Sequence, residues 1–177
     1  MKKAIEEMVI EVLRERKWKV TTAESCTGGL LAGRLLNVSG ASEVYEEGHI
    51  TYSNAAKEKI LGVAHETLEK FGAVSSQTAE EMARGAATIA NANAALVTTG
   101  IAGPTGGTKE KPVGLVYIGC CLNNRIRVEE CHFHGTREEI RTASVERAIE
   151  ILREELEDTL SVQETVCDSG MEEKNAD

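Results

Sequence analysis

The sequence predicts an α/β fold in which helices cover both faces of one mixed sheet. Up to Thr99, segments rich in β-branched residues alternate with segments whose apolar residues recur at helical spacing. Two later β-like segments, residues 113–121 and 125–133, flank Asn123-Asn124, a pair typical of a hairpin turn. A long helical pattern follows them. Together these features predict a single three-layer α/β/α domain with a mixed sheet, a late β-hairpin and a long C-terminal helix.

The first part of the chain is expected to contain two strand-to-helix turns. Residues 37–42 form a Ser/Gly-rich loop that ends one helix, and Asn54 can cap another that stops at Gly62. The expected elements are, in order, an amphipathic helix at residues 4–13, a strand at 18–22, a helix at 30–36, a strand at 48–53, the short helix from Asn54, and a helix at 65–71 closed by Gly72.

The second part is expected to end the domain with a long helix. Thr136 and Glu139 fit the capping-box pattern at its start, and the helical pattern runs towards Leu160. Before it come a helix at residues 78–90 capped by Ser75 or Ser76, a buried strand at 94–99, a glycine-rich loop at 100–108, and the hairpin. From Ser161 onward the chain is polar and lacks periodicity. We therefore expect a domain at residues 1–160 and a disordered acidic tail at 161–177.

Composition excludes several classes of protein. The 177 residues are 41% hydrophobic and 28% charged, which is typical of a globular chain. A net charge of −9 argues against a nucleic-acid partner. No apolar run reaches membrane-spanning length and the N-terminus is too acidic for a signal peptide, so neither a membrane partner nor export is expected. The five cysteines are an odd number without C-x-x-C spacing, which favours a reducing cytoplasm over a disulfide framework: Cys26, Cys120, Cys121, Cys131 and Cys167.

Ser25 is the first candidate for a functional residue. In α/β sheets, ligands gather at the carboxyl ends of the strands, and here the loops after Thr22, Ser53 and Thr99 are expected to meet. Ser25 lies where the first strand gives way to a helix, so it is either a helix cap or a nucleophile. Cys26 is also a candidate nucleophile, because a helix N-terminus would lower the pKa of its thiol, but it lacks an obvious neighbouring histidine and is the second choice.

General motifs give mostly negative results. Ala23 and Thr27 stand where a nucleophile elbow needs glycine, so an ordinary α/β-hydrolase is not expected. Neither Ser25 nor Ser53 begins an S-x-x-K pattern. The loop at residues 100–108 is neither a Walker A nor a dinucleotide fingerprint. The histidines and Cys131 fit a surface pattern better than a metal site, so no metal is expected.

Seven blocks of the sequence, in order and covering nearly all of residues 1–160, resemble the C-terminal domain family of competence/damage-inducible protein A. A single block would be a weak signal, but seven in register are a strong one. The blocks are Thr22-Ala23-Glu24-Ser25-Cys26-Thr27-Gly28-Gly29, Tyr52-Ser53-Asn54 with Lys57, Leu61-Gly62-Val63, Gly72-Ala73-Val74-Ser75, Thr99-Gly100-Ile101-Ala102-Gly103-Pro104 with Gly106-Gly107-Thr108, Lys111-Pro112-Val113-Gly114, and Arg137-Glu138-Glu139-Ile140-Arg141.

The resemblance implies a cytoplasmic, stand-alone nicotinamide-nucleotide amidase, which hydrolyses the carboxamide of nicotinamide mononucleotide in pyridine nucleotide salvage. It implies Ser25 as nucleophile, with Lys57 and Tyr52 as activating partners and either of them as the general base. It implies no metal or other cofactor, and a homo-oligomer. Family activity does not extend to every member, so the alternative is a nucleotide-binding or regulatory relative without turnover.

Further site residues are expected around this group. The backbone N–H groups of Cys26 and Thr27 would form an oxyanion hole at the helix start. The substrate would contact the glycine-rich loop, Arg141, which resembles a family position, and Ser42 in a family turn. Arg137 precedes Arg141 by one helical turn on roughly the same face. The loop residues expected to bind substrate are Thr99, Gly100, Gly103 and Thr105.

Overall fold

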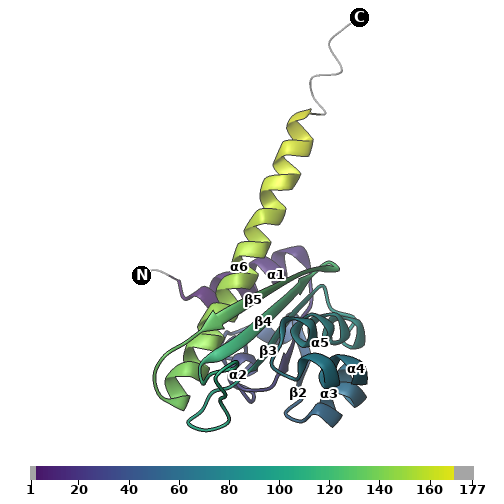
Figure 1. The fold of residues 1–177 in the computed structure, drawn as a ribbon. Helices are drawn as coiled ribbons and strands as arrows, with labels where there is room; N and C mark the ends of the chain where they lie inside the picture. Colours follow the sequence, from purple (N-terminus) through teal and green to yellow (C-terminus); the bar gives the residue numbers. More distant parts are fainter. Residues whose placement is uncertain (1–2, 170–177) are drawn as a thin grey trace, which may run out of the picture.

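The computed structural model describes residues 3–169 (Figure 1). It describes side-chain surroundings for residues 3–159. The helices are α1 (Ile5–Arg16), α2 (Leu30–Leu36), the 3-10 turn η1 (Ala41–Glu43), α3 (Asn54–Leu61), α4 (His65–Phe71), α5 (Ser76–Ile89) and α6 (Arg137–Ser169). The strands are β1 (Val20–Glu24), β2 (Tyr45–Ile50), β3 (Ala94–Gly100), β4 (Leu115–Leu122) and β5 (Arg125–His132). In this part of the chain no helix is long and apolar enough to cross a membrane.

The five strands form one mixed sheet in the order β2-β1-β3-β4-β5. Strand β1 pairs in parallel with both β2 and β3, so these three strands end at the same edge of the sheet. The late hairpin adds β4, which is antiparallel to β3, and β5, which is antiparallel to β4. The predicted α/β class with a mixed sheet is confirmed, and the shared edge is the place where the loops after β1, β2 and β3 meet.

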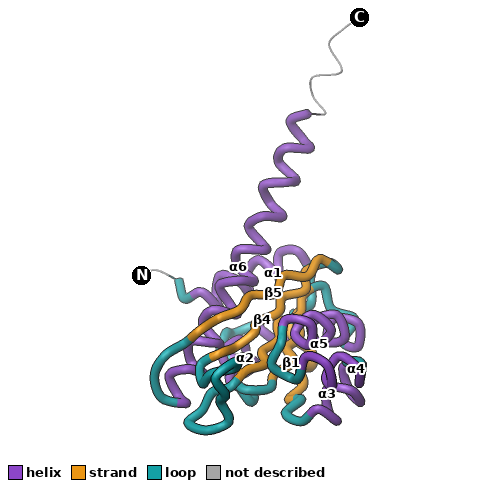
Figure 2. The backbone as a smooth tube through the Cα atoms, viewed as in Figure 1, coloured by secondary structure: helices purple, strands orange, loops and turns teal. Residues whose placement is uncertain are grey.

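Helices cover both faces of the sheet (Figures 1 and 2). The alternation of β3 side chains shows this directly: Leu96 packs in a core formed with α1, α2 and α6, whereas Val97 packs in a second core formed with α3, α4 and α5. Helix α5 approaches β4 closely, because a Cβ on Gly119 would lie 3.0 Å from the Ala79 carbonyl oxygen. The predicted three layers are thus confirmed, and the small residues of α5 allow this close packing.

Several strands have bounds that differ from those predicted; β4, for example, begins at Leu115 and not at residue 113. Strand β1 begins at Val20, two residues after the predicted start, and Trp18 instead lies against the guanidinium of Arg16, 4.7 Å from the ring centre. Strand β2 ends at Ile50, before the predicted end at Ser53. Ser53 is the N-cap of α3 because its Oγ accepts a hydrogen bond from Ala56 N at 3.1 Å, so the prediction of an Asn54 cap is wrong.

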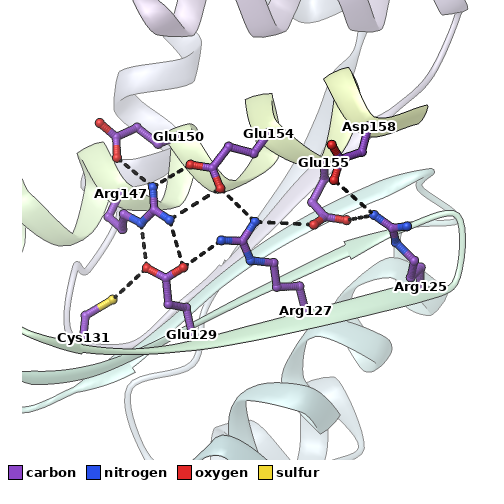
Figure 3. A network of polar contacts seen from close by, with 9 residues as sticks. All are labelled: Arg125, Arg127, Glu129, Cys131, Arg147, Glu150, Glu154, Glu155 and Asp158. Atoms are coloured by element: carbon purple, nitrogen blue, oxygen red, sulfur yellow. Dashed lines mark hydrogen bonds and ion pairs between the residues drawn. The ribbon is translucent and has the colours of Figure 1, made fainter. Parts of the chain in front are cut away.

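Helix α6 is joined to β5 by a network of arginines and glutamates (Figure 3). Arg147 donates to both carboxylate oxygens of Glu129, at 2.6 and 2.9 Å, and Arg127 donates to Glu154 at 2.8 Å. The Arg147 guanidinium, with Arg127, lowers the pKa of Glu129 to about 2. Bidentate, coupled pairs of this kind contribute more than isolated surface ion pairs. The network therefore joins the middle of α6 to β5 and helps to orient the helix, whose first turns reach the sheet edge.

The predicted capping box at the start of α6 is present, since Thr136 N donates to Glu139 Oε2 at 2.7 Å. Helix α6 then runs to Ser169, past the domain boundary expected at residue 160. Its last turns occupy the first part of the segment expected to be a disordered tail. The rest of that segment, residues 170–177, lies outside the described residues.

Candidate active site

A cavity of about 220 Å³ opens at the sheet edge where β1, β2 and β3 end. The loops expected to meet there do so. The residues that line the cavity come from the loops after β1 and β2, from the end of β3 and the loop after it, from the loop between α4 and α5, from α3 and from the start of α6: Ser25, Cys26, Tyr52, Lys57, Ala73, Val74, Thr99, Gly100, Ala102 and Arg137.

Ser25 and Lys57 form a direct hydrogen bond inside this cavity. Lys57 Nζ donates to Ser25 Oγ at 3.1 Å and to the Thr51 carbonyl oxygen at 2.8 Å. Helix α3 presents Lys57 from its first turn, and the carbonyl that follows β2 fixes the end of the side chain. A hydroxyl within hydrogen-bond reach of an amine is the arrangement that nucleophilic catalysis by serine requires.

The environment of Lys57 favours its neutral form. Lys57 is 1% exposed, and within the described residues its amine donates to Ser25 Oγ and the Thr51 carbonyl and pairs with no carboxylate. Burial lowers the pKa of Lys57 to about 8. At pH 7, roughly 10% of Lys57 is then neutral, compared with about 0.03% for a lysine of ordinary pKa. Lys57 is therefore able to accept the proton of Ser25.

The turn after β1 is held by Glu24, for which the sequence predicts no role in the site. Its buried carboxylate accepts hydrogen bonds from the backbone N–H groups of Gly29, Leu31 and Ala32 at 2.8–3.0 Å, and from Thr27 Oγ1 at 2.5 Å. These N–H groups belong to the start of α2, which favours a negative charge. The signal in the sequence was an acidic residue shortly before a helix start.

Two backbone N–H groups remain available beside Ser25. Within the described part of the chain, the N–H groups of Cys26 and Thr27 donate to no protein oxygen, whereas Ser25 N donates to the Thr98 carbonyl at 2.9 Å and Gly28 N to the Ser25 carbonyl at 3.2 Å. They lie directly after the candidate nucleophile, where an oxyanion would form during attack on a carbonyl. Because Glu24 occupies N–H groups further along, an oxyanion hole here depends on Cys26 and Thr27.

Arg141 contacts this turn rather than the cavity. Its Nε donates to the Cys26 carbonyl at 3.1 Å and its Nη2 to the Thr27 carbonyl at 2.8 Å. Because the C=O and N–H of one planar peptide point in opposite directions, holding the Cys26 carbonyl directs the Thr27 N–H away from Arg141. Arg141, expected to contact substrate, therefore has its guanidinium engaged with the backbone of the turn.

The expected lowering of the Cys26 thiol pKa is wrong. The side chain is 5% exposed, and burial raises its pKa to about 11. The effect of desolvation on the thiolate is larger than any effect of the nearby helix start, whose N–H groups Glu24 already occupies. Cys26 is thus a protonated thiol near neutral pH, which weakens it as an alternative nucleophile.

Tyr52 lies at the mouth of the cavity rather than beside the serine. Its side chain is 64% exposed, and its hydroxyl oxygen accepts a hydrogen bond from Arg137 Nη2 at 3.2 Å. Within the described residues it makes no hydrogen bond to Ser25 or Lys57. As it lies here, Tyr52 is not in position to take the proton of Ser25.

Of the remaining expected site residues, two line the cavity and three do not. Thr99 and Gly100 line the cavity, where Thr99 Oγ1 donates to the Ala73 carbonyl at 2.7 Å. The Gly103 carbonyl accepts from Arg137 Nη1 at 2.7 Å. Thr105 is exposed and does not line the cavity. Ser42 is exposed in η1, which precedes β2 and so lies at the opposite end of the parallel strands from the cavity.

Arg137 lines the cavity, although the sequence favoured Arg141. Among the described residues no group of three or more histidine, cysteine, aspartate or glutamate side chains is placed to hold a metal ion. The chemistry available at the cavity is therefore that of a hydroxyl, a buried amine, free backbone N–H groups and one exposed guanidinium.

Comparison with known proteins gives a consistent result. The model of the CinA C-terminal domain family matches residues 2–156. Proteins named competence-damage inducible protein are 54% identical over 152 residues in Clostridium novyi (strain NT) and 53% identical over 149 residues in Thermoanaerobacter pseudethanolicus. These alignments cover 86% and 84% of this chain, and the chain spans only 37% and 36% of the length of those relatives.

Two solved structures are similar over nearly their whole length. A CinA superfamily protein from Klebsiella pneumoniae 700603 superimposes with a TM-score of 0.84 at 36% identity, covering 87% of this chain and 96% of that one. The competence/damage inducible protein CihA from Agrobacterium tumefaciens gives 0.79 at 44% identity, covering 86% and 96%. Sequence and fold therefore point to the same family.

Proposed function

This chain belongs to the CinA C-terminal domain family, and we propose that it is an amidase that hydrolyses the carboxamide of nicotinamide mononucleotide to nicotinate mononucleotide and ammonia. One observation carries the proposal: Lys57 Nζ lies 3.1 Å from Ser25 Oγ in a buried site that lowers the pKa of Lys57 to about 8. A module that only binds a nucleotide has no need of a serine paired with a buried amine. The role in pyridine nucleotide salvage and a homo-oligomeric state are parts of the same proposal.

The reaction begins with Ser25. Neutral Lys57 takes the hydroxyl proton as Ser25 Oγ attacks the carboxamide carbon, and the carbonyl oxygen becomes an oxyanion. The N–H groups of Cys26 and Thr27 stabilise this charge, at roughly 3 kcal/mol for each donor in comparable sites. Protonated Lys57 then donates its proton to the amide nitrogen, so ammonia leaves and an ester remains on Ser25.

Water completes the cycle. Lys57, neutral again, takes a proton from a water molecule that attacks the ester carbon. The carboxylic acid of the product is released as the proton returns from Lys57 to Ser25 Oγ. One water is consumed and one ammonia is formed in each turnover, and the same amine serves as base and acid in both halves.

Ammonia release from nicotinamide mononucleotide tests the proposal. The wild-type protein should release ammonia in proportion to the enzyme concentration, and the Ser25→Ala variant should release none. Ser76→Ala serves as the matched control, because Ser76 is not the N-cap of α5 and its hydroxyl donates to Gln77 on the surface. Binding of the nucleotide without ammonia release by the wild type would favour the non-catalytic alternative. Full release by Ser25→Ala would remove Ser25 as the nucleophile.

A further inference from the structure

Arg137 is a cation at the cavity mouth without a carboxylate partner. Among the described residues, most arginines lie within 4.0 Å of a carboxylate oxygen: Arg14, Arg34, Arg84, Arg125, Arg127, Arg147 and Arg153. Arg137 forms no such pair in this part of the chain and contacts only neutral oxygens. In a protein of net charge −9, an unneutralised guanidinium lining a cavity calls for an explanation.

The position of Arg137 is fixed from two sides. Its Nη1 donates to the Gly103 carbonyl at 2.7 Å, and its Nη2 donates to the Tyr52 hydroxyl at 3.2 Å. Gly103 lies on the loop after β3, and Tyr52 lies between β2 and α3. The guanidinium thus connects two of the loops that form the cavity, and it is held in place without being neutralised.

Donor groups remain free after these contacts. A guanidinium has five N–H donors, of which two are used here. The Tyr52 oxygen accepts from Arg137, so its own O–H is left to donate. A planar cation beside a hydroxyl donor matches the oxygens of a phosphate group, which guanidinium binds with charge-assisted hydrogen bonds.

Apart from the Cys26 and Thr27 N–H groups, which the oxyanion would occupy, the other groups near Ser25 that could bind an anion are already engaged. Glu24 occupies N–H groups at the start of α2, and Arg141 binds the Cys26 and Thr27 carbonyls. Lys57 is committed to Ser25 and the Thr51 carbonyl. A negative charge on a substrate whose amide faces Ser25 would therefore meet Arg137.

We propose that Arg137 and the Tyr52 hydroxyl bind the phosphate monoester of the substrate, so that Tyr52 acts in substrate recognition and not as the base of Ser25. This inference rests on the proposed amidase function for the identity of the substrate. It assigns Arg137 as the residue that makes the enzyme prefer a nucleotide to the corresponding nucleoside.

The test compares two substrates that share the carboxamide. Nicotinamide mononucleotide carries the phosphate and nicotinamide riboside lacks it. For Arg137→Met, kcat/KM for the nucleotide should fall roughly 10- to 100-fold, mainly through KM, while kcat/KM for the riboside changes less than about threefold. Tyr52→Phe should show a smaller loss of the same kind with an unchanged pH profile. Arg84→Met, which removes a surface charge paired with Glu80, should leave both substrates unaffected.

Two results would overturn the inference. One is an equal loss on both substrates in Arg137→Met. The other is a fall in kcat with a displaced pH profile in Tyr52→Phe, which would indicate that Tyr52 takes part in the proton transfer from Ser25.

Calorimetric binding to Ser25→Ala separates this inference from the proposed function. If that variant binds the nucleotide at least tenfold more tightly than the riboside, and Arg137→Met in the same background removes the difference, the phosphate site stands even when the wild type releases no ammonia. If the wild type releases ammonia but Ser25→Ala binds both compounds equally, the proposed phosphate site is wrong and the proposed amidase activity is supported. Inorganic phosphate should compete with the nucleotide in the first case only. If Ser25→Ala binds neither compound and the wild type releases no ammonia, both proposals are wrong.

Discussion

Hydrolysis should rise with pH and level off near the pKa of Lys57. With a pKa of about 8, neutral Lys57 makes up roughly 1% of the protein at pH 6, 10% at pH 7 and half at pH 8. If neutral Lys57 takes the proton of Ser25, kcat/KM should follow these fractions. A lysine with its ordinary pKa would supply about 300-fold less neutral amine at pH 7. Because an amine of lower pKa is also a weaker base, burial of Lys57 raises the rate by less than this factor.

The assay is ammonia release from nicotinamide mononucleotide between pH 6.5 and 10 at constant ionic strength. The lower limit avoids the second ionisation of the phosphate, which lies near pH 6. We expect kcat/KM to rise about tenfold per pH unit below pH 7.5 and to become constant above about pH 8.5. Lys57→Arg, which keeps the positive charge but has no accessible neutral form, should be inactive throughout. A flat profile, or one that still rises at pH 10, would refute the role of Lys57 as base.

Three further predictions concern stability. The pKa of Lys57 is lower in the folded than in the unfolded protein, so the unfolded chain binds more protons between pH 8 and 10.5. In urea titrations, the free energy of unfolding of the wild type should therefore rise relative to that of Lys57→Met by roughly 2 kcal/mol from pH 7 to 9.5. A difference between the two proteins that stays constant with pH would contradict this. Glu129 acts in the same direction at lower pH, because its pKa is also lower folded than unfolded: its contribution, roughly 1–3 kcal/mol relative to Glu129→Gln, is present above pH 4.5 and should be lost as the pH falls towards 2, and a difference independent of pH would count against it. Glu24→Gln turns an amide N–H₂ towards backbone donors, which should cost about 1–3 kcal/mol of unfolding free energy for each unmatched donor. Both the urea midpoint and the rate of ammonia release should therefore fall. An unchanged midpoint would show that the carboxylate does not hold the turn.

The sequence predicted the elements well where local signals and packing agree. Helix α2 has the predicted bounds, residues 30–36, because glycines precede it and a Ser/Gly-rich loop follows. The predicted end of β2 was wrong because Ser53 suits both a strand and a cap, and only the hydrogen bond to Ala56 N decides between them. Local composition thus identifies an element more reliably than it places the element's ends.

Residues of the site were harder to place. Arg137 and Arg141 lie one turn apart, and which of them faces the cavity depends on the rotation of α6, which the ion pairs of Arg147 with β5 help to fix. The burial of Lys57 likewise depends on segments far away in the chain, whereas its place in the sequence is that of an ordinary helix lysine. Long-range packing of this kind leaves no local signal.

The central claim, that Ser25 carries the acyl group, is tested most directly by mass spectrometry of acid-quenched enzyme. Wild-type protein is mixed with excess nicotinamide mononucleotide, quenched within the first turnover and digested, and ammonia is measured in the same samples. We expect a nicotinate mononucleotide ester on the peptide containing Ser25, formed together with the first ammonia and absent in Lys57→Arg. A burst of ammonia equal to the enzyme with Ser25 unmodified, or with the adduct on Cys26, would contradict the mechanism.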